Sequence, residues 1–160
     1  MPIYMNWGNS QPPKVKGDVD DPQHAGWIEL TSLQFGTLRG ISAPTGNSCD
    51  EPASGVKEIV ITKDQDMTSH QFFQLSMHGE PVPVAVDFVT RDGPTPYVYL
   101  RLTLSGVLIS GYSQGGNGRP NETMSLTYTK LEWGPAKGVT PHASVPPSFL
   151  SRSTGCSASR

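Results

Sequence analysis

Hydrophobic and polar residues alternate along several short stretches of this chain, the pattern of half-buried β-strands. The clearest case is VPVAVDFV, in which Val82, Val84, Val86 and Phe88 fall on one side. The same period of two occurs in five further stretches, so we expect an antiparallel arrangement of short strands. The six predicted strands span residues 3–7, 27–36, 57–63, 82–89, 97–112 and 123–133.

Two of these strands contain a position at which the alternation is interrupted. In the fifth, Val98, Leu100, Leu102 and Leu104 alternate with outward residues up to Gly106, and a glycine inside a strand indicates a bend or a bulge. In the sixth, Leu131 and Trp133 are out of phase with Met124 and Leu126, which again predicts a bulge.

One stretch, residues 66–79, has helical spacing instead. Asp66 or Thr68 is a suitable N-cap, and Gly79 is a suitable stop. The residues at helical spacing are Phe72, Phe73, Ser76 and Met77. We therefore predict a mainly β fold, a small antiparallel β-barrel or sandwich flanked by one short α-helix.

Two segments lack strand and helix signals. Residues 40–57 form a long predicted loop, and loops of this length in compact domains usually have a function or are disordered. Residues 134–160 are rich in Pro, Ser, Gly and Thr and are predicted to be a flexible tail. The β domain is accordingly expected to span residues 1–133.

Composition supports a single globular β domain. The 160 residues include 17 Gly and 15 Pro, which favour turns over long helices. The net charge of −2 gives no reason to bind nucleic acid or an anionic membrane. The first 80 residues carry 5 basic and 10 acidic groups (−5) and the last 80 carry 7 and 4 (+3). This asymmetry fits a solvated surface or, alternatively, attraction between copies of the chain.

Targeting and cysteine signals are sparse. No apolar run approaches the roughly 20 residues of a membrane helix, and MPIYMNWG lacks the features of a secretory leader. We expect synthesis in the cytoplasm and, if the protein is exported, a route without a cleaved leader. Cys49 and Cys156 do not form a metal-binding or disulfide pattern, so both are predicted to be free thiols.

The stretch GYSQG, residues 111–115, matches the G-x-S-x-G pattern of a hydrolase nucleophile elbow around Ser113. That elbow requires a helix directly after the serine, whereas GGNGRPNE follows here. The remaining triad members would be Glu122 or Glu132 and then His142, in the predicted flexible tail. A catalytic base must be held rigidly, so we predict a hairpin and not a catalytic serine.

Other signs of site chemistry are weaker. The four histidines lack the spacing of metal ligands. The acidic run Asp18, Asp20 and Asp21 lacks the glycine and the terminal glutamate of a calcium loop. We therefore expect no metal, no cofactor and no catalytic residue.

Several motifs follow one another along the chain in a fixed order. They are PIYM, GDV at 17–19, His24 followed by WIEL-x-S-x-QFG, Arg39, EIVITK with Asp66, Ser69 and Phe72-Phe73, LSGVLISGYS, and GRPNE-x-x-SLTYTK. Together these motifs resemble the haemolysin-coregulated protein (Hcp) family, the inner-tube subunits of bacterial type VI secretion systems. The chain departs from the usual pattern at Thr127-Tyr128, where an Asn-Phe pair is common, and after Trp133.

The resemblance implies a β-barrel that assembles head to tail into a hexameric ring. It further implies that the rings stack into a tube, that a contractile sheath expels this tube behind a spike protein, and that the lumen can carry effector proteins. The expected partners are therefore copies of this chain, the spike, the sheath and effectors, with no nucleic acid and no membrane insertion. Export through the type VI apparatus would need no cleaved signal peptide.

We expect the predicted loop, residues 40–57, to contact a neighbouring subunit or the next ring. The alternative is a surface loop without such a contact. Ser32 and Gln34, polar positions of the second strand, are the candidates for the ring lumen. The candidate contact residues are Ser42, Ala43, Pro44, Thr45, Gly46, Asn47, Ser48, Asp50, Glu51, Pro52 and Ser54.

Two other functions stay open from the residues alone. One is a small serine hydrolase that uses Ser113. The other is a monomeric β-sandwich that binds carbohydrate through exposed Trp27, Tyr97 and Tyr99.

Overall fold

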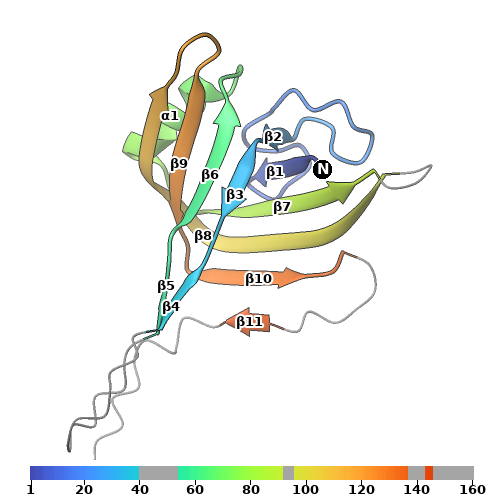
Figure 1. Cartoon of the computed structure of the whole chain (residues 1–160), viewed down its shortest axis with the longest axis vertical. Coiled ribbons are helices and arrows are strands. Elements are labelled where there is room, and N and C mark those ends of the chain that lie inside the picture. Colours follow the sequence, from blue (N-terminus) through green and yellow to red (C-terminus); the bar gives the residue numbers. More distant parts are fainter. Residues whose placement is uncertain (40–53, 92–95, 137–142, 146–160) are drawn as a thin grey trace, which may run out of the picture.

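A nine-stranded antiparallel sheet curls into a barrel, with helix α1 against one side and a two-stranded hairpin projecting from the body (Figure 1). The computed structural model describes residues 1–39, 54–91, 96–136 and 143–145. The elements are β1 (Ile3–Trp7), β2 (Ile28–Leu30), β3 (Ser32–Gln34), β4 (Thr37–Arg39), β5 (Ser54–Val56), β6 (Ile59–Asp64), α1 (Ser69–His78), β7 (Val82–Thr90), β8 (Tyr97–Gly115), β9 (Asn121–Thr127), β10 (Lys130–Gly134) and β11 (Ala143–Val145).

The main sheet runs in the order β2-β1-β7-β8-β9-β6-β3, and β10 and β11 extend it beside the first half of β8. The two ends of this path, β2 and β3, are consecutive in the chain. Thr31 separates them and donates its N–H to the Thr62 carbonyl at 2.8 Å, which closes one corner of the barrel. The predicted mainly β fold with one short helix is confirmed.

The long strand β8 forms the opposite corner. Its first half pairs with β7 and β10, and its second half pairs with β9. Between the halves, Gly106 has a φ of 61°, and the β7–β8 register shifts between Val82 and Val84. A Cβ at position 106 would lie 2.5 Å from Thr129 Oγ1, so this bend requires glycine. The predicted bend is confirmed.

Two predicted strands are each divided in two. In the stretch 27–36, β2 pairs with β1, and after Thr31 β3 pairs with β6. In the stretch 123–133, β9 pairs with the second half of β8, and after Thr127 β10 pairs with its first half. The prediction of single strands, the second with a bulge, was wrong. A sheet that curls into a barrel turns corners, and at a corner a strand changes its neighbour. The phase shift at Leu131 marks that change.

Helix α1 begins after Thr68 and ends before Gly79, as two of the predicted signals indicate. Phe72 is fully buried, and its ring packs edge-on against Trp7 at 5.3 Å. Phe73 and Met77, however, are 53% and 62% exposed, so the buried stripe is narrower than the apolar spacing predicted.

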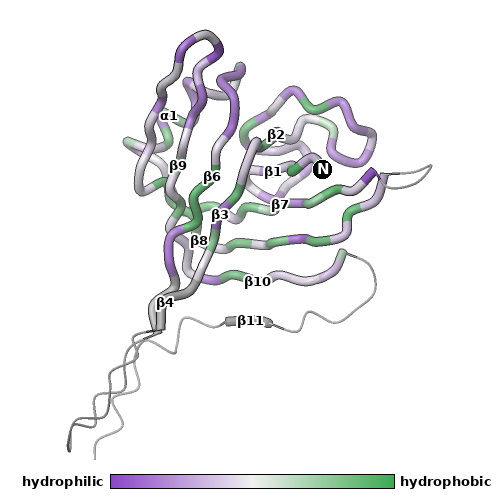
Figure 2. Tube along the Cα trace, viewed as in Figure 1, coloured by the Kyte–Doolittle hydropathy of each residue, from purple (hydrophilic) through white to green (hydrophobic). Residues whose placement is uncertain are grey.

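The main core fills the inside of the barrel, and a smaller cluster covers the outer face of β1 and β7. Figure 2 shows hydrophobic residues along β7 and β8 and the lower parts of β6 and β9, whereas the upper end of β6 is hydrophilic. The fully buried residues of the main core include Met5, Ile28, Ile59, Ile61, Val84, Val86, Leu102, Leu104, Met124 and Leu126. The outer cluster contains Tyr4, Val19, Trp27, Ala85 and Val89.

Strands also occur where none was expected. Ser54–Val56, at the end of the predicted loop, pairs with Thr37–Arg39, and Ala143–Val145, in the predicted tail, pairs with Leu131–Trp133. Each pairing depends on a partner distant in the chain, which a local pattern does not reveal. Residues 40–53 of the predicted loop and residues 137–142 and 146–160 of the predicted tail lie outside the described residues.

Candidate assembly surface

Ser113 lies in an exposed part of β8 and pairs across the hairpin with Thr123. Its hydroxyl is 3.5 Å from the Thr123 carbonyl, and the chain turns directly into β9 instead of a helix. The two candidate carboxylates, Glu122 and Glu132, form ion pairs with lysines instead. His142 lies outside the described residues. The prediction of a hairpin is therefore confirmed.

The core-facing side of the sheet is incompletely covered at one end. Phe88 pairs with Leu100 in the same register in which the buried pairs Val86–Leu102 and Val84–Leu104 follow, so all share one face. Trp133 and Leu131 of β10 lie opposite Leu102 and Leu104 and extend this face. Phe35 lies against Trp133, with ring centroids 5.9 Å apart. We call Phe35, Phe88, Leu100, Leu131 and Trp133 the open end of the barrel.

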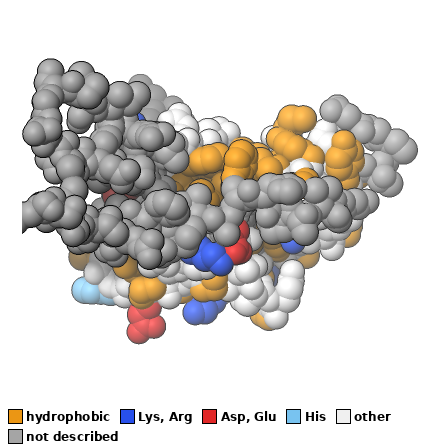
Figure 3. Space-filling model, turned by 90° about the horizontal axis from the view of Figure 1, so that it is seen from below, with side chains coloured by type: hydrophobic (Ala, Val, Ile, Leu, Met, Phe, Trp, Pro, Cys, Tyr) orange, Lys and Arg blue, Asp and Glu red, His pale blue; other side chains and the backbone are white. Residues whose placement is uncertain are grey.

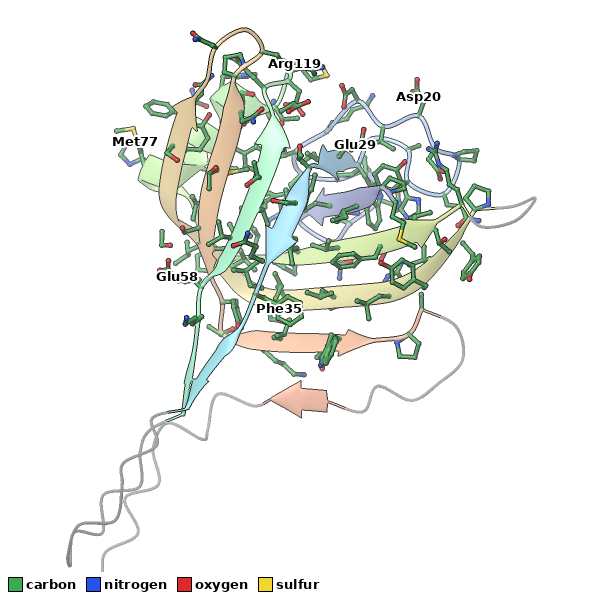
Figure 4. All side chains as sticks on the ribbon, in the orientation of Figure 1. Asp20, Glu29, Phe35, Glu58, Met77 and Arg119 are labelled. Atoms are coloured by element: carbon green, nitrogen blue, oxygen red, sulfur yellow. The ribbon has the colours of Figure 1, made fainter. Side chains whose placement is uncertain are left out.

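The open end leaves apolar surface accessible. Phe35 and Trp133 are 41% and 42% exposed, and Phe88, Leu100 and Leu131 are half-buried against the core. Seen from below, hydrophobic side chains gather in the middle of the molecule (Figure 3). Figure 4 shows Phe35 beside β10, far from Arg119 at the tip of the β8–β9 hairpin. A contiguous apolar patch rich in aromatic residues is typical of a protein interface.

The β4–β5 hairpin continues β3 and β6 away from the barrel (Figure 1). Arg39 pairs with Ser54 at the described end of this hairpin. The other predicted contact residues, Ser42 to Pro52, lie outside the described residues, so the structure places only their two attachment points.

The remaining predicted surface residues differ in how exposed they are. Ser32 is half-buried and Gln34 is exposed, both on β3. Tyr97 and Tyr99 are exposed, as the carbohydrate-binding alternative requires, but Trp27 is only 5% exposed. The expectation of an exposed Trp27 was wrong, because segment 17–27 folds over the sheet and packs this ring with the outer cluster.

A buried ionic cluster ties the start of α1 to the sheet. Lys63 is fully buried, and its Nζ lies 2.7 Å from Asp66 Oδ1 and 3.1 Å from Glu122 Oε2. Asp66 Oδ1 also accepts a hydrogen bond from the Thr68 backbone N–H at 2.7 Å. Lys63 thus links β6, β9 and the turn before α1.

This environment shifts the pKa values of two side chains, Asp66 and Tyr112. Burial by itself would raise the pKa of Asp66, but hydrogen bonds from Lys63 and Thr68 outweigh it and hold that pKa below the usual range. Burial, and then the charge of Glu122, raises the pKa of Tyr112 to about 12. Asp66 is therefore ionised and Tyr112 is neutral near pH 7.

A second buried cluster lies on the outer face of the sheet. His24, 2% exposed, faces Asp21 through Nδ1 at 3.1 Å and Asp87 through Nε2 at 3.0 Å. The fully buried Asp87 also accepts two hydrogen bonds from Arg101, and this contact raises the pKa of the guanidinium further.

The described residues contain no group of three or more His, Cys, Asp or Glu side chains placed to hold a metal ion. Within the same residues, no helix has the length and apolarity to cross a membrane. Cys49 and Cys156 lie outside them.

The family model described as "Type VI secretion system effector, Hcp" matches residues 4–134. The chain belongs to the Hcp family. It is thus a secreted component of the type VI secretion system, of the tube and effector class, and its role is structural and not enzymatic. The resemblance to Hcp is confirmed.

Solved structures share the fold at low sequence identity. Hcp1 from E. coli EAEC 042, solved as a mutant, is 19% identical with a TM-score of 0.77, over 92% of this chain and 99% of that one. A type six secretion system protein is 21% identical with a TM-score of 0.70, over 82% of each chain. Secreted protein Hcp3 from Pseudomonas aeruginosa is 17% identical with a TM-score of 0.63, over 82% and 90%. Comparison with curated protein sequences found no match.

Sequence reasoning missed the two buried clusters of this Hcp-family chain, although one left a signal. Lys63 follows Ile59 and Ile61 at intervals of two and therefore shares their inward face. His24 and Asp87 are separated by 63 positions, and nothing local indicates that they meet.

Proposed function

We propose that this chain is a tube subunit that closes head to tail into a six-membered ring. The observation that carries the proposal is the open end, whose apolar side chains continue the barrel core and are left partly exposed among the described residues. A head-to-tail contact joins two different surfaces of identical subunits and closes when six rotations complete a turn. In this arrangement a neighbouring barrel covers Phe35 and Trp133.

The rings then stack into the inner tube of the type VI apparatus. We assign the stacking contact to the β4–β5 hairpin and the loop Ser42–Ser54 at its tip, because this hairpin projects away from the barrel (Figure 1). In the assembled machine the partners are the spike protein at the tip, the contractile sheath outside the tube and effector proteins within it. The protein leaves the cell through this apparatus.

Ser32 and Gln34 of β3 are proposed to face the lumen of the ring. Their partial or full exposure and uncharged side chains suit a hydrated channel that carries cargo without a fixed binding site. An electron-microscopy reconstruction of the ring tests this placement, since β3 on the outer surface would exclude it.

Native mass spectrometry tests the ring. We expect particles of about six times the 17.2 kDa chain mass for the unmodified protein. Trp133→Asp should weaken ring formation by more than tenfold, because aromatic side chains at the centre of an interface carry much of its binding energy.

The matched control is Phe73→Asp, which changes an exposed aromatic residue on α1, away from the open end. It should leave the ring intact. Circular dichroism checks whether both variants are folded. Rings of equal stability in the Trp133 variant and the unmodified protein would exclude the open end as the contact.

A further inference from the structure

His24 is placed so that both of its ring nitrogens face carboxylate oxygens, Asp21 Oδ1 at 3.1 Å and Asp87 Oδ2 at 3.0 Å. An ionised carboxylate only accepts hydrogen bonds, and a neutral imidazole has only one N–H to donate. With a neutral ring, one nitrogen lone pair would face a carboxylate oxygen inside the protein, where such a contact is costly. An imidazolium, with two N–H donors, satisfies both contacts.

Hydrogen bonds from other groups favour the ionised form of both carboxylates. Each oxygen of Asp87 already accepts a hydrogen bond from the Arg101 guanidinium, which leaves no need for a carboxyl proton. Asp21 Oδ1 also accepts the Gln23 backbone N–H at 2.9 Å. Burial would raise the pKa of Asp21, but the bonds from Gln23 and His24 lower it overall.

The charges of the cluster balance only when His24 is charged. The two cations His24 and Arg101 then match the two anions Asp21 and Asp87. The other side chains against the imidazole are aromatic: Tyr4 of β1, with ring centroids 5.0 Å apart, and Trp27, edge-on at 4.8 Å. Their π faces also favour a cation. Beyond Asp21, an adjoining pocket of about 330 Å³ is lined by Tyr4, Asp18, Val19, Asp20, Asp21, Glu29 and Arg91.

This ring joins segment 17–27 to the sheet. The backbone hydrogen bonds of the segment run largely within it, for example from Gly17 N to Gly26 O and from Trp27 N to His24 O. A Cβ at Gly17 would lie 2.1 Å from the Trp27 carbonyl, so the two arms of the segment are in close contact. The bond from His24 to Asp87 of β7 fixes the folded segment over the sheet.

We propose that His24 is a charged latch, which holds segment 17–27 closed over the outer apolar cluster as an imidazolium and releases it when the ring loses its proton. The closed state binds one proton more than the open state. Its stability is therefore full at low pH and is lost as the pH rises. Opening exposes the outer cluster that contains Tyr4, Val19, Trp27, Ala85 and Val89.

Protonation is tested directly by NMR of the full chain with ¹⁵N-labelled histidine. At pH 7 we expect both His24 nitrogens to carry protons, with the signal assigned by its absence in His24→Gln. A His24 signal of a neutral, singly protonated ring would overturn the proposal.

Opening is tested by amide hydrogen exchange of the unmodified full chain between pH 6 and 9, with rates corrected for the intrinsic effect of pH. Protection of peptides within residues 17–27 should fall at least tenfold across this range, while that of β6 and β9 stays constant. His78→Gln, an exposed histidine of α1, should behave like the unmodified protein. Constant protection of residues 17–27 in the unmodified protein would overturn the latch.

Discussion

Lys63 is a fully buried cation with a carboxylate on either side, and it lies on the same strand face as Ile59 and Ile61. Burying a charge is costly unless it is paired, and here one ammonium group forms ion pairs with both Asp66 and Glu122. The ion pairs of Lys63 add little net stability themselves, but without them a charge would be buried without a counter-charge. It also places the start of α1, since Asp66 binds the Thr68 N–H.

Lys63→Met should lower the free energy of unfolding by about 3–5 kcal/mol, because it leaves Glu122 buried without a counter-charge. The double variant Lys63→Met/Glu122→Gln should recover part of this loss. Urea denaturation followed by fluorescence measures both. A double variant that is as unstable as the sum of the two single variants would contradict the coupling.

At the scale of elements, β8 determines the barrel. Its 19 residues serve two parts of the sheet, and the bend at Gly106 lets one strand turn the corner between them. The bend combines a positive φ with a close approach to Thr129, so the position has two independent reasons to exclude a side chain. Helix α1, by contrast, contributes little burial beyond Phe72.

Gly106→Ala should lower the free energy of unfolding by about 1–3 kcal/mol through backbone strain and contact with Thr129. Gly111→Ala is the matched control on the same strand. Its Cβ would meet Ser125 at 3.7 Å, an ordinary contact. Thermal or urea denaturation should show a clear loss for the first variant and a small change for the second. Equal changes would show that the bend tolerates a Cβ.

At the scale of the whole molecule, the two regions that we assign to assembly adjoin each other. Phe35 of the open end lies two positions before β4, and the β4–β5 hairpin projects from the barrel beside β10 (Figure 1). A closed ring and a stack of rings need two different contacts. Because the regions consist of different residues, each contact can be changed by its own substitution.

Replacing residues 40–53 with Asn-Gly should join Arg39 to Ser54 by a tight two-residue turn that suits an antiparallel hairpin. We expect rings of unchanged mass in native mass spectrometry but no stacks in negative-stain images. Trp133→Asp, in comparison, should weaken the rings themselves by more than tenfold. Loss of the rings in the shortened chain would instead assign the loop to the contact between neighbours in one ring.

Local pattern predicted much of the fold and little of the surface. Val82, Val84 and Val86 alternate and are buried, Thr68 and Gly79 bound the helix, and Gly106 marks the bend. These features depend on neighbours close in sequence. Trp27 and Lys63 were not anticipated in their roles, because their burial depends on a covering segment and on Glu122, which is distant in the chain.

The sequence by itself therefore determined the strands, the helix, the absence of a nucleophile elbow and, through its ordered motifs, the family. Only the tertiary structure decided where strands change partners, which ionic groups meet in the interior and which end of the core the described residues leave partly exposed. The physical reason is that periodicity reports the environment of a segment, whereas partners and open surfaces arise when distant segments meet.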